Sequence, residues 1–324
     1  MGFDITGLHH IGHVVRDMAE ALALYRRLGF AVPPPGYPTM APHEGAEPVP
    51  FGAANTHADF ARDFLELATV VRADSEIPAD AKLVPLLAPP DVLPVLLERI
   101  GSTSANLAVC LDRFEGLHIL MFSSADIDTT AERLAGAGVR HGGVNTVQRP
   151  VRTDAGTTME TVRYLEIDGD RPGTEAEGRI GVVADLDPDI QGTRLLEHPN
   201  GAVALLEAVV CVAADELDAV TARYTAYLDR TAEHDGVTRM FDLGVARLNL
   251  VADGDLGTLL PGERPLALPA LVGFTVGVRD VAVTGRLLRD NGIATRRTAA
   301  GDVFVPADAA MGAAIVFRDV SDSS

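Results

Sequence analysis

The chain of 324 residues contains no tryptophan, and aromatic residues make up only 5% of it. The stacking surfaces that binders of flat apolar molecules use are therefore sparse. Positive charge is scarce too, because 27 Lys and Arg side chains stand against 46 Asp and Glu side chains, for a formal net charge of −19. A nucleic-acid backbone or an anionic membrane surface would repel such a chain at long range, so we expect neither as a partner.

Several other features are missing from the sequence. The only cysteines, Cys110 and Cys211, lie in separate apolar runs, which predicts buried reduced thiols rather than a disulfide or a nucleophile. No stretch approaches ~18 uninterrupted apolar residues, and the first residues lack a basic region followed by an apolar core. We therefore expect a cytoplasmic protein without a membrane span. Glycine-rich phosphate loops, serine nucleophile elbows and Cys–His nucleophile patterns are also missing.

A repeated spacing organises what is present. Three times an aspartate closes a strand-like run and a glycine follows after a helix-like run, at Asp17 to Gly29, Asp126 to Gly138 and Asp280 to Gly292. Aspartate caps helix N-termini and glycine ends helices, and the apolar residues between them recur at spacings of three and four. Each segment is therefore predicted to be an amphipathic helix. A unit of strand, helix and about three strands recurs near residues 5–68, 114–168, 203–252 and 270–318.

Two short phrases also recur within the first two units. One is Phe64-Leu65-Glu66-Leu67 and Tyr164-Leu165-Glu166-Ile167; the other is Gly7-Leu8-His9-His10 and Gly116-Leu117-His118-Ile119. A carboxylate inside an apolar strand is costly unless a cation or a hydrogen-bond donor meets it. Each unit thus offers a histidine near its start and a glutamate near its end, and two His and two Glu could hold one metal ion.

Together these features resemble the vicinal oxygen chelate superfamily, in its glyoxalase-like branch. The opening strand His10-Ile11-Gly12-His13-Val14-Val15-Arg16-Asp17 and the Leu-Glu-Leu strand carry the resemblance. It implies an α+β fold in which four βαβββ modules pair into two open, cup-like mixed β-sheets with helices outside. We expect a domain of residues 1–190 with the candidate metal site. A second domain, residues 191–324, lacks a complete ligand set, because Asn249 and Val316 replace the glutamates.

The resemblance places a divalent metal ion inside the N-terminal cup. Its implied ligands are His10, Glu66, His118 and Glu166. Imidazole and carboxylate together suit Zn, Ni, Fe, Mn or Co, and leave the identity of the metal open.

Strand geometry limits which histidines reach the cup. Alternate residues of a strand share a face, so His10 is predicted to point inward while His9 and His13 face the helix; the choice between His9 and His10 stays open. His118 stands eight residues before Asp126 rather than seven, and only a strand bulge would turn it into the cup. The second module therefore contributes either His118 or no histidine.

The resemblance implies a lyase or isomerase of glyoxalase type that acts on a small oxygen-chelating substrate through an enediolate. Glu66 or Glu166 would be the general base, with its pKa raised by the apolar strand. One alternative is an Fe(II) dioxygenase of extradiol type, which needs three ligands on one face of the ion. Another is a metal-free small-molecule binding or resistance protein.

Arginines matter most if no metal is bound. Glu66 and Glu166 would then need cationic partners, for which Arg149 and Arg163 are available, and we regard Arg149 and Arg16 as candidate substrate contacts. The insert at residues 69–113, with a short helix predicted at 91–100, is either a packed connection or a lid over the cup. We expect a monomer or a homodimer whose partner is a small-molecule substrate.

Overall fold

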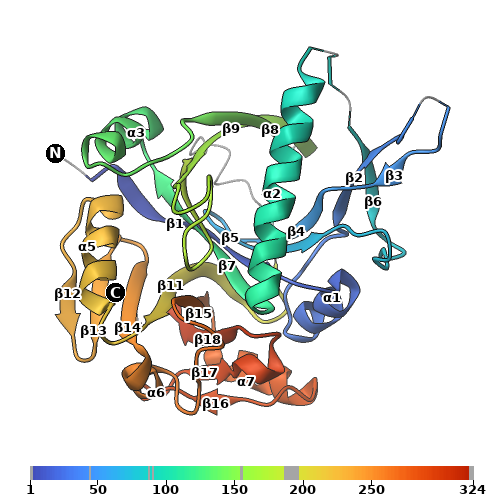
Figure 1. Ribbon diagram of the computed structural model, residues 1–324. Coiled ribbons are helices and arrows are strands. Elements are labelled where there is room, and N and C mark those ends of the chain that lie inside the picture. Colours follow the sequence, from blue (N-terminus) through green and yellow to red (C-terminus); the bar gives the residue numbers. More distant parts are fainter. Residues whose placement is uncertain are drawn as a thin grey trace.

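The computed structural model describes residues 3–43, 45–86, 88–89, 91–153, 156–185 and 197–320. It is an α+β protein built on a large mixed sheet that does not close into a barrel, and Figure 1 shows the N-terminal half above the C-terminal half. The two halves meet where Leu117 pairs with Leu271. The predicted fold class is confirmed. The predicted domain boundary at residue 190 lies outside the described residues.

The N-terminal half of the sheet has the order β4-β5-β1-β7-β10-β9-β8, and β2, β3 and β6 extend it beyond β4. The strands are β1 (Ile5–Val14), β2 (Gly36–Met40), β3 (Val49–Pro50), β4 (Ala53–Asp59), β5 (Phe64–Val70), β6 (Lys82–Pro85), β7 (Gly116–Ser124), β8 (Asn145–Thr153), β9 (Gly156–Glu166) and β10 (Arg179–Ala184). The central pair, β1 and β7, is antiparallel, and each runs parallel to its outer neighbour, β5 or β10.

The C-terminal half repeats this plan around β11 and β15, which pair with β14 and β18. Its strands are β11 (Ala202–Val212), β12 (Glu233–Asp235), β13 (Thr238–Asp242), β14 (Arg247–Ala252), β15 (Ala270–Val278), β16 (Arg296–Arg297), β17 (Val303–Val305) and β18 (Ala314–Asp319). Helix α6 (Leu256–Leu259) and neighbouring strands supply a second apolar cluster, and Arg318 Nη1 donates to Glu207 Oε1 at 2.7 Å. In the C-terminal half, packed apolar side chains and an ion pair therefore stand where the N-terminal half has its predicted metal ligands.

Helices cover the outer faces of both halves. Three of them, α1 (Met18–Arg27), α3 (Ile127–Gly136) and α7 (Val281–Asp290), lie where the aspartate and glycine spacing predicts them. The helix of the third unit, α5 (Leu217–Leu228), begins after Glu216 and ends at Asp229 instead. Asp17, Asp126 and Asp280 each accept hydrogen bonds from backbone N–H groups of the first turn. Those bonds satisfy donors that a helix start leaves without partners, so the predicted caps are confirmed.

The second module ends differently from the prediction. Its last strand is β10, which pairs parallel with β7 as β5 pairs with β1. The phrase that contains Glu166 lies in β9, the strand before, which occupies the place of β4. Glu166 is therefore not the counterpart of Glu66, contrary to what the recurring phrases predict. The strand equivalent to β5 is the Arg-Ile-Gly-Val-Val-Ala run at residues 179–184.

The insert crosses the open face of the N-terminal sheet. Helix α2 (Leu93–Arg113) has 21 residues, much longer than the short helix predicted. Its buried residues, Asn106, Leu107, Cys110 and Leu111, all lie in its C-terminal half, which packs on the sheet. The N-terminal half stands over the sheet, and Figure 1 shows α2 passing in front of β5 and β7. In the part of the chain that the structure describes, no helix is long and apolar enough to span a membrane.

Candidate functional site

A cavity of about 1600 Å³ lies between the sheet and α2. Its walls are mostly aliphatic side chains and prolines from the segments around β2, β4 and β9. Val95, Leu96, Arg99, Ile100 and Thr103 of α2 form its roof at spacings of one helical turn. The insert is thus a wall of the site rather than only a connection. Drug-sized ligands fill cavities of roughly 300–1,000 Å³, so this one can take a bulky organic molecule.

One row of residues crosses the floor of this cavity. The strand register aligns His57, Glu66, Gly12, Ile119 and Arg179, on β4, β5, β1, β7 and β10 in turn. Residues opposite one another on neighbouring strands share a face of the sheet. His57, Glu66 and Arg179 accordingly all line the cavity.

The next row along the strands carries Phe64, His10, Met121, Gly181 and Glu166. Glu166 Oε1 accepts hydrogen bonds from Nε and Nη2 of Arg179, at 2.9 Å from Nε. Burial lowers the pKa of Arg179, but the negative charges of Glu166 and Glu66 raise it by more than burial lowers it. The net pKa is raised, so the guanidinium stays charged.

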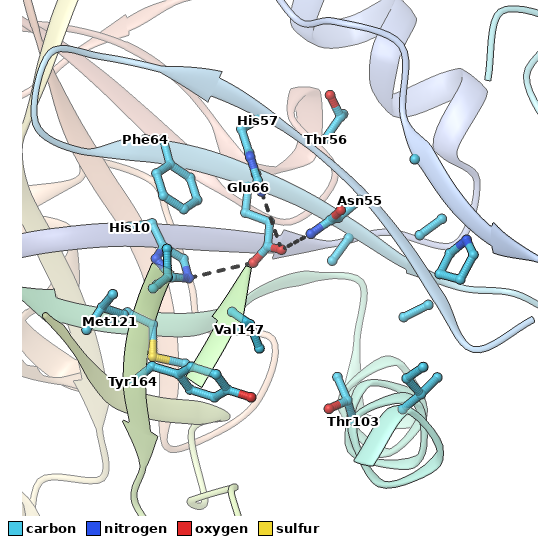
Figure 2. Close-up of a pocket in the computed structure, with 18 of the residues that line it drawn as sticks. His10, Asn55, Thr56, His57, Phe64, Glu66, Thr103, Met121, Val147 and Tyr164 are labelled. Carbon is cyan, nitrogen blue, oxygen red and sulfur yellow. Dashed lines mark hydrogen bonds and ion pairs between the residues drawn. The ribbon is translucent and has the colours of Figure 1, made fainter. Parts of the chain in front are cut away.

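The Glu66 carboxylate is the polar centre of the floor (Figure 2). Asn55 Nδ2 donates to its Oε1 at 2.7 Å, His57 Nε2 lies 3.8 Å from the same oxygen, and His10 Nε2 lies 3.7 Å from Oε2. Burial by itself raises the pKa of Glu66, but the nearby His57 ring and the charges of His10 and Arg179 lower it well below its usual value. The prediction of a raised pKa was wrong, because the strand is apolar while the neighbouring strands supply donors and cations.

His10 points into the cavity, as predicted. Its ring stacks on Phe64 with 4.4 Å between centroids, and its Nδ1 lies 2.7 Å from Nδ1 of His9. His9 was expected on the opposite face but lines the same cavity, because the β1–β7 register shifts between Leu8 and His10. His13 does lie on the helix side, where its Nδ1 is 2.9 Å from the Tyr25 hydroxyl of α1.

His118 lies outside the cavity lining. A register shift does occur in the ladder beside it, between Gly12 and His13. The ring nevertheless packs against Phe114, and its Nε2 is 2.9 Å from the Phe114 carbonyl oxygen. Burial lowers the pKa of His118 to about 4, so at neutral pH the ring is uncharged.

The arginines considered from the sequence have other places. Arg16 is exposed and its guanidinium bonds the carbonyl oxygen of Leu111, so Arg16 does not line the cavity. Arg163 pairs with Asp128 on the surface. The side chain of Arg149 lies outside the described residues. Glu166 does have an arginine partner, but that partner is Arg179.

A bound divalent ion needs several ligand atoms that converge on one point. Glu166 is held by a guanidinium, His118 is turned away, and the row through Glu66 ends in the cation Arg179. His10 and His57 approach different oxygens of the Glu66 carboxylate. No group of three or more His, Cys, Asp or Glu side chains in the described segments could hold a metal ion. The residues of this cup do not fit a divalent ion, because a buried guanidinium already occupies Glu166 and its positive charge, which also acts on Glu66, repels one.

Comparison with known proteins places the chain in a family. Residues 8–228, more than half of the chain, match the family model of the glyoxalase-like domain. The chain belongs to this family, which is part of the vicinal oxygen chelate superfamily. No curated protein matches the chain at a significant level.

Solved structures share the fold at low sequence identity. A hypothetical protein from Staphylococcus aureus has a TM-score of 0.54 at 10% identity, with 97% of this chain and 99% of that chain covered. A mutant 4-hydroxymandelate synthase from Streptomyces coelicolor has a TM-score of 0.54 at 16% identity, covering 97% and 93%. A fusion protein of a xylose isomerase-like TIM barrel and 4-hydroxyphenylpyruvate dioxygenase has a TM-score of 0.51 at 12% identity, covering 98% and 49%. At such identities the likeness shows the fold alone.

Reasoning from the sequence missed three residues of the floor. His57 and Asn55 lie two residues apart on β4, an alternation that places both on one face, and they could have been found once that segment was assigned to a strand. Arg179 follows a polar, turn-rich stretch, and only the parallel pairing of β10 with β7 brings it to the floor.

Proposed function

We propose that this protein is a lyase or isomerase of glyoxalase type that moves a proton on a bulky organic carbonyl compound, using His10 and Glu66 without a metal ion. The observation that carries this proposal is the His10–Glu66 pair. Both side chains are mostly buried, both line the cavity, and 3.7 Å separates Nε2 from Oε2. A carbonyl compound of the size of the cavity would be held against this pair by the aliphatic walls and by α2.

His10 is the base in this reaction. In the tautomer in which His10 Nδ1–H donates to His9 Nδ1, Nε2 carries a lone pair and faces the cavity beside Glu66. Nε2 removes the proton from the carbon next to the substrate carbonyl, and the electron pair of that C–H bond moves onto the carbonyl oxygen. With an α-hydroxyketone, the protonated imidazole then gives the proton to the former carbonyl carbon, while the hydroxyl proton passes to the oxygen that gained the charge, so carbonyl and hydroxyl exchange places. Return of the proton to its original carbon instead regenerates the substrate, and in D2O this exchanges the C–H.

Glu66 stays ionised throughout, because His57 and Arg179 lower its pKa while His10 is neutral, and His10 lowers it further once it carries the proton. Its role is to stabilise the imidazolium that His10 becomes, rather than to take the proton itself. Asn55 and His57 fix the carboxylate from its other side.

Deuterium exchange tests this proposal. Benzoin is a bulky apolar α-hydroxyketone, and exchange of its C–H in buffered D2O, followed by NMR, reports the proton transfer directly. The hemithioacetal of phenylglyoxal and glutathione serves as a second probe. We expect the protein to accelerate exchange of at least one probe, and His10→Asn to remove about 10²–10⁴-fold of that rate. Glu66→Gln should reduce it as well.

His234→Ala is the matched control, since His234 is exposed on β12 in the other half of the chain. It should exchange both probes at the wild-type rate. Exchange no faster than in buffer, or a wild-type rate in His10→Asn, contradicts the proposal.

A second function, metal-free sequestration of a hydrophobic molecule, is favoured by one observation: the cavity is large and its walls are mainly apolar. Isothermal titration with deoxybenzoin distinguishes the two functions. A sequestering protein binds the ketone and leaves its C–H unexchanged, and His10→Asn leaves that binding intact.

Elemental analysis of protein purified without added metal tests whether the proposed reaction, or a dioxygenase reaction, depends on a metal ion. We expect far less than one equivalent of Zn, Ni, Fe, Mn or Co. One equivalent that is lost in both His10→Asn and Glu66→Gln would restore the four-ligand prediction. Iron with oxygen-dependent turnover would favour the dioxygenase.

A further inference from the structure

The floor of the cavity carries one cation, Arg179, in a position that the proton transfer described above does not use. It stands in the same row as Glu66, with Gly12 and Ile119 between them. Three strand spacings separate the two residues, about 14 Å along a flat sheet. This spacing is that of the backbones: neither intervening residue has a polar side chain, and the charge of the long Arg179 side chain still acts on Glu66. His10, on β1, is only two strands from β10.

Glu166 fixes the orientation of the guanidinium. Nε and Nη2 of Arg179 both donate to Glu166 Oε1. A two-point contact of this kind holds the planar guanidinium in one orientation. Nη1 has no hydrogen-bond acceptor among the residues that the structure describes, and the side chain is 15% exposed where it lines the cavity. The Nη1 donors are therefore available to a ligand.

Module symmetry strengthens this reading. In the row of paired residues, Glu66 lies on β5 of the first module, and Arg179 lies on β10, the equivalent strand of the second module. A carboxylate and a cation thus occupy matching strands on the two sides of one cavity. A proton donor or carbon acid suits the first side, and an oxygen that gains negative charge suits the second.

We propose that Arg179 Nη1 binds the carbonyl oxygen of the substrate and stabilises the charge that develops there, which makes the substrate a neutral ketone with a bulky apolar body. This inference rests on the proposed function. When His10 Nε2 takes the proton from the carbon next to the carbonyl, the electron pair moves onto the oxygen that Arg179 holds. It moves back when the proton returns to the same carbon, which is the exchange step, or the oxygen takes up the hydroxyl proton when the proton goes to the other carbon. Arg179 stays protonated, so no further reactant is needed.

Neutrality of the substrate follows from the charges around the site. On the floor, Glu66 and Glu166 are both acidic, and Arg179 balances only one of them; the other cations that line the cavity in the described residues, Arg99 and Lys82, lie on α2 and β6, away from the floor. A substrate with a full negative charge would lie between two carboxylates and one guanidinium. A neutral carbonyl gains its partial charge only during the reaction, where the fixed donor acts on it most strongly.

The test uses binding and infrared spectroscopy, which do not depend on turnover. Deoxybenzoin labelled with ¹³C at the carbonyl is bound to the protein, and 1,2-diphenylethane is the matched ligand without the oxygen. We expect a lowered C=O stretching frequency in the complex, and an affinity for the ketone about 10- to 100-fold above that for the hydrocarbon, as a hydrogen bond from a charged donor provides.

The decisive variant is the double substitution Arg179→Met with Glu166→Gln. It removes both charges together, because Arg179→Met alone would leave Glu166 partly buried without its cation. We expect it to bind both ligands with equal affinity and to show no lowered frequency. Arg179→Lys keeps the charge and should retain part of the shift. Arg163→Met with Asp128→Asn removes a surface ion pair outside the cavity and should behave as wild type.

Three outcomes overturn the proposal: wild-type protein that does not bind the ketone, an unshifted C=O frequency in the complex, or a shift that survives the double substitution. Failure of the proposed function looks different. In that case the frequency shift and its loss in the variant are both observed, while neither benzoin nor the hemithioacetal undergoes exchange. Exchange that depends on His10, without any frequency shift, contradicts only the role of Arg179.

Discussion

Gly12 lies between the two charged groups of the cavity floor, and its replacement by alanine is the sharpest test of the strand register. A Cβ atom added at Gly12 would lie 2.5 Å from Cβ and 2.6 Å from Cδ1 of Ile119, far inside van der Waals contact. Overpacking of a tight interior typically costs about 1–3 kcal/mol. We expect Gly12→Ala to lower the free energy of unfolding by that amount, measured by urea denaturation.

Two comparisons isolate the cause. Gly101 lies in α2 with no atom within 4 Å of an added Cβ, so Gly101→Ala should stabilise the protein by roughly 0.5–1 kcal/mol. In an Ile119→Gly background the contact is absent, and Gly12→Ala should then cost almost nothing. Equal stability of Gly12→Ala and wild type would refute the reasoning, because Gly12 and Ile119 would not be neighbours and the row from Glu66 to Arg179 would not exist.

Three further predictions concern stability and reactivity. Burial lowers the pKa of both His13 and His118 to about 4, so the folded chain binds fewer protons than the unfolded chain below pH ~6.5. The free energy of unfolding should therefore be highest above that pH and fall by about 3 kcal/mol per histidine as the pH drops to 4. Urea denaturation at each pH measures this, and a free energy of unfolding that does not change with pH contradicts it. Arg223→Ala should cost about 3–5 kcal/mol in the same assay, because it leaves the fully buried Glu177 carboxylate without its cation. Burial raises the pKa of the two cysteine thiols to about 11 and 12, so neither should react with a thiol reagent until urea unfolds the chain; fast labelling of folded protein would show them to be accessible.

Local signals predicted the helices well. An aspartate cap and a closing glycine act within one or two turns, so their spacing located three helices from the sequence alone. The length of α2 was underestimated because Gly101 and the serines beside it are typical of a helix end. In the folded chain, contacts of the C-terminal half of α2 with the sheet continue the helix past them.

The candidate site depended on pairings that local sequence does not carry. His10 and Glu66 were predicted because they belong to one module, whose strands follow each other closely. Glu166 was matched to Glu66 by similar neighbours in sequence, whereas the ladder shows that β10, not β9, is the strand equivalent to β5. Arg179 reaches the floor only through that long-range pairing.

In the proposed mechanism the cup is a metal-free site in which His10, Glu66 and Arg179 act on one carbonyl compound. A crystal structure of the protein with benzoin bound, from crystals whose metal content has been measured, tests that claim most directly. The predicted result is a ligand whose carbonyl oxygen lies within hydrogen-bond distance of Arg179 Nη1, with its C–H carbon beside His10 Nε2. A metal ion coordinated by His10 and Glu66, or a ligand bound away from this floor, would contradict it.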